Sequence, residues 1–167
     1  MGNRWFQPWW ALNLDCPSPW YATENGTKAL SSFFNRFAEP RLRIGIPVVG
    51  CPDYAKLIAQ RAQTAGVPFA PPYYPEHLRS YVDKHDPASC PFRAKDWSNP
   101  FLGKRILILS GGKDTLVPWS VSKDFAEGLY IGDGVKRVVV EEDAGHECTP
   151  VMIKEIVLFI QDWLNGE

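Results

Sequence analysis

Hydrophobic runs in the last third of the chain predict two strands with a helix between them. Residues 105–110 and 136–141 are short, mostly apolar and rich in β-branched side chains, as buried strands are. Residues 119–130 instead repeat apolar positions at helical spacing, which predicts an amphipathic helix. Its buried face is expected to hold Val121, Phe125, Ala126 and Leu129.

A further helix is predicted to close the chain at residues 151–164. Thr149 carries the hydroxyl of a typical N-cap, and Pro150 suits the first helical position, where its missing N–H has no cost. One apolar stripe is expected to face the sheet, and the spacing assigns to it Ile153, Ile156, Val157, Ile160 and Leu164.

The upstream part has a less regular pattern. Residues 27–39 have an apolar face at helical spacing, which predicts an amphipathic helix ended by Pro40. Residues 41–50 predict a short buried strand, in which Pro47 indicates an edge or a bulge because it cannot donate to a neighbouring strand. The tryptophan-rich residues 1–24 show neither a helical nor an alternating period.

The long segment between the first two strands is expected to be an insertion. Asp53 can cap a helix at 54–65 that Gly66 ends, and a second short helix is predicted at 76–84. The rest of 51–103 is predicted to be loop, and a connection of this length is more typical of a lid than of a tight turn.

Strands that alternate with helices predict an α/β fold with a parallel sheet. We expect about three parallel strands with flanking helices and a helical lid insertion at 51–103. The predicted division is an irregular tryptophan-rich N-terminus with an amphipathic helix at 1–38, followed by a partial α/β domain at 39–167.

Composition excludes several classes of function. The net charge of −1 and the absence of a basic patch argue against nucleic-acid binding. No apolar stretch is long enough to span a membrane and no signal peptide is recognisable, so a cytoplasmic location is expected. The cysteines at 16, 51, 90 and 148 are scattered, which favours incidental thiols over a metal site or a disulfide framework, and no cofactor is implied.

Candidate chemistry lies on two loops that follow predicted strands. Asp114 comes after the strand at 105–110, and His146 after the strand at 136–141. Parallel strands deliver such loops to one edge of the sheet, so the two side chains are expected to meet. A carboxylate can then hold the imidazole in one tautomer and stabilise its charged form, while the neighbouring glycines permit the sharp turns that aim both side chains.

These residues resemble the C-terminal third of an α/β-hydrolase. SGGKDTLVP supplies the family's G-x-x-D-x-x-V-P pattern after the seventh strand, and Gly145-His146 supplies its Gly-His after the eighth. The resemblance covers about residues 39–167, and it implies that Asp114 and His146 are the acid and base of a catalytic triad. It also implies an ester or peptide substrate, and a lid at 51–103. His77 and His85 lack such a context and are expected on the lid surface.

The third member of such a triad is not recognisable. The chain contains no G-x-S-x-G, the elbow that carries the family's nucleophile, and Ser31 and Ser32 lie within the predicted helix at 27–39. Cys51 is an alternative nucleophile, but Pro52 follows it and has no N–H to donate to an oxyanion.

Two interpretations therefore stay open. In the first, the chain is the C-terminal portion of a serine hydrolase of esterase or peptidase type, inactive alone, from a truncated gene, an alternative transcript or a mis-set gene model. In the second, it is a non-catalytic remnant that binds a ligand or partner. Both leave an exposed sheet edge, so we expect poor solubility or self-association, which a cooperative monomeric melt would contradict.

Overall fold

The computed structural model describes residues 42–166 as a layered α/β unit. In this part of the chain a three-stranded parallel sheet has the order β1-β2-β3, formed by Ile44–Gly45, Arg105–Gly111 and Val135–Glu141. The helices are α2 (Tyr54–Ala65), α3 (Glu76–His85), the 3₁₀ turn η2 (Pro87–Ser89), α4 (Trp119–Gly128) and α5 (Pro150–Leu164). The α/β class with parallel strands is confirmed, and the predictions for residues 1–38 lie outside the described residues.

The first strand is shorter than the sequence predicts, and Pro47 explains why. β1 pairs with β2 only at Ile44 and Gly45, and beyond Pro47 a single bridge joins Val48 to Leu109. The carbonyl of Pro47 still accepts from the N–H of Leu109 at 2.9 Å. In the described sheet β1 is an edge strand, where the missing N–H of a proline is tolerated.

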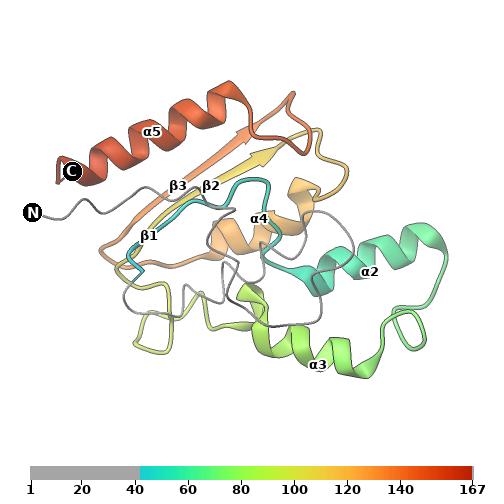
Figure 1. Ribbon diagram of the computed structural model, residues 1–167. Helices are drawn as coiled ribbons and strands as arrows, with labels where there is room; N and C mark the ends of the chain where they lie inside the picture. Colours follow the sequence, from blue (N-terminus) through green and yellow to red (C-terminus); the bar gives the residue numbers. More distant parts are fainter. Residues whose placement is uncertain (1–41, 167) are drawn as a thin grey trace, which may run out of the picture.

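Alternate residues of β2 face two separate helical layers, as the period of a strand requires. Leu107 and Leu109 pack with Met152 and Phe159 of α5. On the other face, Ile106 and Ile108 form a cluster with α4 and the loops beside it. Figure 1 shows α5 along one side of the sheet, with α4 and the α2–α3 segment on the other. The face predicted for α4 is confirmed: Val121, Phe125 and Ala126 are buried, and so is Leu129 at the C-cap of the helix.

The stripe predicted for the closing helix is wrong in most of its members. Thr149 and Pro150 begin α5 as expected, but the residues that it buries are Met152 and Phe159, with Ile156 packed beside them. Ile153 and Val157 are about half exposed, at 51% and 47%. Because α5 has apolar residues on most sides, two different stripes satisfy helical spacing. The stripe that faces the sheet is the one that contains Phe159, which is larger than the aliphatic residues of the predicted stripe.

The segment 51–103 has two structurally different parts. As predicted, α2 has Asp53 as its N-cap, accepting from the N–H of Lys56 at 2.8 Å, and ends at the left-handed Gly66. The loop that follows η2 is instead part of the core. Asn99 donates to the carbonyls of Phe92, Ala94 and Tyr130, which seats two phenylalanines, Phe92 and Phe101, against α4. The loop prediction missed this packing.

No helix within residues 42–166 has both the length and the apolar character needed to cross a membrane.

Candidate functional site

Asp114 and His146 meet at the carboxyl edge of the sheet. The Nδ1 of His146 lies 2.8 Å from Oδ2 of Asp114, in hydrogen-bond contact. Both loops arrive there because β2 and β3 are parallel and paired in register from Arg105 opposite Val135 to Gly111 opposite Glu141. The prediction that Asp114 and His146 meet is therefore confirmed.

The Asp114 carboxylate is buried and is held on both oxygens. Its Oδ1 accepts from the N–H groups of Leu116 at 2.8 Å and Val117 at 2.9 Å, so the same side chain closes the turn that carries it. The Asp114 side chain is 1% exposed, whereas the His146 side chain is 26% exposed. The acid is thus fixed in the interior, while the imidazole reaches the surface.

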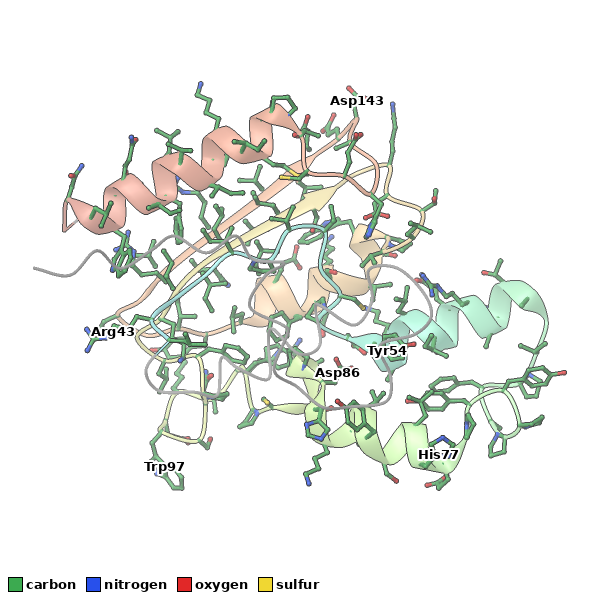
Figure 2. The ribbon with its side chains drawn as sticks, in the orientation of Figure 1. Arg43, Tyr54, His77, Asp86, Trp97 and Asp143 are labelled. Atoms are coloured by element: carbon green, nitrogen blue, oxygen red, sulfur yellow. The ribbon has the colours of Figure 1, made fainter. Side chains whose placement is uncertain are left out.

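Backbone hydrogen bonds join the two loops independently of the side chains. The N–H of Gly112 donates to the carbonyl of Glu141 at 2.8 Å, and the N–H of Lys113 donates to Ala144 at 2.9 Å. Lys113 forms an exposed ion pair with Asp143. Figure 2 labels Asp143, which lies on the loop just after β3. An exposed pair of this kind contributes little, so the backbone contacts set the loop spacing.

The glycines beside Asp114 allow close packing of the backbone and do not adopt a left-handed conformation. A Cβ on Gly111 would lie 2.3 Å from the carbonyl oxygen of Gly145, and one on Gly112 would lie 2.7 Å from that of Glu142. Neither glycine has a positive φ. Gly145 has open space where its Cβ would be. Gly112 lies in the turn that follows β2, as predicted, and the absent side chains of Gly111 and Gly112 also let the histidine loop approach.

Cys51 is a poor candidate nucleophile on its own surroundings. Its side chain is 3% exposed and packs with Leu57, Val117 and Val121. Burial raises the pKa of the thiol to about 12, against a smaller opposing effect of its hydrogen bond to the carbonyl of Asp53. A thiol that stays protonated at neutral pH is a weak nucleophile. Its position is that of a core residue.

Asp86 is a titratable group that sequence reasoning missed. Its Oδ2 accepts from the N–H groups of Tyr54, at 2.7 Å, and Ala55, at 3.4 Å, so it caps α2 from the end of α3. Figure 2 shows Tyr54 and Asp86 close together where these helices meet. Burial raises the pKa of Asp86 to about 7, and the two backbone hydrogen bonds only partly oppose the shift. Nothing in its sequence context distinguishes this aspartate.

The other histidines lie away from the pair. His77 is exposed on α3, and Figure 2 shows it on the opposite side of the view from Asp143. His85 is half-buried against the ring of Tyr81, with centroids 4.4 Å apart. Within residues 42–166 no three histidine, cysteine or acidic side chains gather as metal ligands would.

The geometry of the pair defines which proton transfers it can perform. A carboxylate only accepts hydrogen bonds, so Nδ1 of His146 donates to Asp114 and Nε2 is left as the basic nitrogen. An imidazole held in this tautomer can take a proton from a hydroxyl or thiol placed at Nε2. The arrangement is that of an oriented general base.

Comparison with known proteins identifies no relative: no family model, no curated protein and no solved structure matches the chain.

Proposed function

We propose that this chain is the C-terminal portion of a serine α/β-hydrolase that cleaves ester or peptide bonds. The observation that carries the proposal is the buried Asp114 carboxylate at 2.8 Å from Nδ1 of His146, on adjacent parallel strands. In this role Asp114 orients His146, and His146 removes the proton of a serine hydroxyl supplied by an upstream strand–elbow–helix segment. Residues of the 51–103 insertion then roof the substrate pocket.

The order of elements supports the same proposal. β1, β2 and β3 correspond to the sixth, seventh and eighth strands of the family, and α5 to its closing helix. Asp114 and His146 follow β2 and β3, which is the family's order of acid and base. The fifth strand and the nucleophile elbow would then lie beside β1, the edge from which the described sheet can be extended.

The test is to supply the missing nucleophile. The coding sequence upstream of Met1 is read in the same frame for a strand followed by G-x-S-x-G, and the joined protein is assayed with p-nitrophenyl esters and a fluorophosphonate. We expect hydrolysis and a single serine adduct. We expect Asp114→Asn to lower kcat by a factor on the order of 10⁴, since the tautomer is then wrong. A folded joined protein that neither hydrolyses nor forms an adduct would sink the proposal.

The second candidate is a non-catalytic remnant that associates through its sheet edge. Two observations favour it: the chain contains no G-x-S-x-G, and in the described sheet β1 has a strand on one side only. An open edge of this kind recruits other chains. An upstream frame without the elbow segment, and a 167-residue chain that self-associates and takes no fluorophosphonate, would favour this reading.

A further inference from the structure

The loop that carries His146 is closed at its base by a side-chain hydrogen bond. Residues 142–148 connect the end of β3 to the start of α5. The hydroxyl of Thr149 donates to Oε2 of Glu141 at 2.5 Å, so the residues on either side of the loop are tied together. Hydrogen bonds from a hydroxyl to a carboxylate are among the short and strong ones.

Thr149 performs a second task with the same oxygen. Its Oγ1 accepts from the N–H of Met152 at 3.1 Å and thereby caps α5. Because one hydroxyl both donates to Glu141 and accepts from Met152, the first turn of α5 is fixed relative to the end of β3. Met152 is itself fully buried against the sheet, so the helix start cannot shift without disturbing the core.

The backbone of Glu141 joins the acid loop to the histidine loop. Its carbonyl accepts from the N–H of Gly112 at 2.8 Å and from that of Ala144 at 3.1 Å. Glu141 therefore contacts the loop that bears Asp114, the loop that bears His146, and the helix that follows.

We propose that Glu141 is a positioning residue, which acts through Thr149 to hold His146 against Asp114. Among residues 42–166 His146 has one hydrogen-bond partner, Asp114, and its side chain is partly exposed. Few contacts therefore hold the imidazole directly, and its position depends on the conformation of the loop that carries it. Tying the loop ends together removes conformations in which the two side chains separate. That this contact serves catalysis rests on the proposed function. The effect of Glu141 on the contact between Asp114 and His146 does not.

The test measures the Asp114–His146 hydrogen bond directly in the full chain, without substrate. In ¹⁵N-labelled protein the Nδ1–H of His146 gives a low-field proton resonance, assigned by its loss in His146→Gln. Glu141→Leu removes the acceptor of Thr149 but leaves the cap of α5, and we expect this resonance to exchange with water about tenfold faster or to broaden away. Glu141→Gln keeps an acceptor oxygen and should restore it. Glu142→Leu, at the exposed neighbouring position, is the matched control and should leave it unchanged.

A second pair of variants covers the case in which Glu141→Leu unfolds. Thr149→Ser keeps both hydrogen bonds and Thr149→Val removes both, so only the valine variant should lose the resonance. An unchanged resonance in a folded Glu141→Leu or Thr149→Val chain would overturn the inference. Failure of the proposed function is a separate result. In that case the joined protein would form no serine adduct, while the unmodified chain would still give a sharp Nδ1–H resonance.

Discussion

The sheet edge with Asp114 and His146 differs from the α2–α3 segment in how it treats buried polar groups. At the edge, both carboxylate oxygens of Asp114 are hydrogen-bonded. In the α2–α3 segment, the hydroxyl of Tyr74 and Oδ1 of Asp86 are buried without a hydrogen-bond partner among residues 42–166. Leaving a buried polar atom unpaired costs free energy. The hydrogen bonds at the sheet edge therefore hold the Asp114 carboxylate in one position, whereas the α2–α3 segment contains buried polar atoms that lack such support.

The stability of the two regions therefore depends on different properties, namely backbone packing in one and protonation in the other. The edge depends on close backbone packing, because Gly111 and Gly112 admit the histidine loop. The α2–α3 segment depends on protonation, because burial raises the pKa of Asp86 to about 7. Substitutions that repair the second region or crowd the first should have opposite effects on stability.

The largest effect is expected from Asp86→Asn, and its sign depends on pH. The unfolded chain releases this proton near 3.8, whereas the folded chain holds it to about 7. Proton binding therefore stabilises the fold fully below pH 3.8, and the benefit is lost as the pH rises through 7. Asparagine mimics the protonated acid and can still cap Tyr54, so at pH 8 the variant should be more stable, by up to about 4 kcal/mol.

Urea denaturation at pH 4, 6 and 8 measures this difference. The free energies of unfolding of variant and unmodified chain should agree most closely at pH 4, diverge progressively between pH 4 and pH 7, and differ by a constant amount above pH 7. Asp133→Asn, at an exposed position in the turn before β3, is the control and should change little at any pH. Parallel pH profiles for Asp86→Asn and the unmodified chain would contradict the prediction.

Crowding the edge should destabilise the other region. An alanine Cβ at Gly111 would lie 2.3 Å from one backbone oxygen and 2.5 Å from another, neither of which belongs to a flexible side chain. We expect a loss of about 3 kcal/mol and separation of Asp114 from His146. Gly145→Ala, in open space, is the control, and equal losses for the two variants in chemical denaturation would refute the packing argument.

A third prediction concerns Val49, just beyond β1. Its φ of 46° is positive, and this conformation is strained for a β-branched residue. The N–H of Val49 donates to the carbonyl of Leu109 at 2.8 Å, and this hydrogen bond holds the strained backbone in place. Glycine accepts this conformation freely and alanine does not. Val49→Gly should therefore be more stable than Val49→Ala by about 1 kcal/mol, the reverse of the order expected at an unstrained position. Urea denaturation of the two variants checks the order.

The sequence predicted the features that follow from local rules. Strand and helix limits in the last third are within two residues of the structure, and the meeting of Asp114 with His146 follows from parallel pairing. The face of α5 was mistaken, because a helix with apolar residues on most sides has no unique stripe. Asp86 and Asn99 were missed because their roles come from residues distant in sequence, such as Tyr54 for Asp86 and Tyr130 for Asn99.

The smallest effect is expected where the two regions are linked. Nη2 of Arg61, on α2, donates to the carbonyl of Leu116 at 2.8 Å, and the N–H of Leu116 in turn donates to Asp114. Arg61→Met keeps the apolar stem and removes this link, for a loss of about 1 kcal/mol or less. Hydrogen exchange of the Leu116 and Val117 amides should quicken, because their acceptor is then less firmly held. Arg79→Met, which removes only an exposed ion pair on α3, should leave these amides unchanged. If exchange is equal in both variants, the hydrogen bond from Arg61 to Leu116 does not help to hold Asp114 in place.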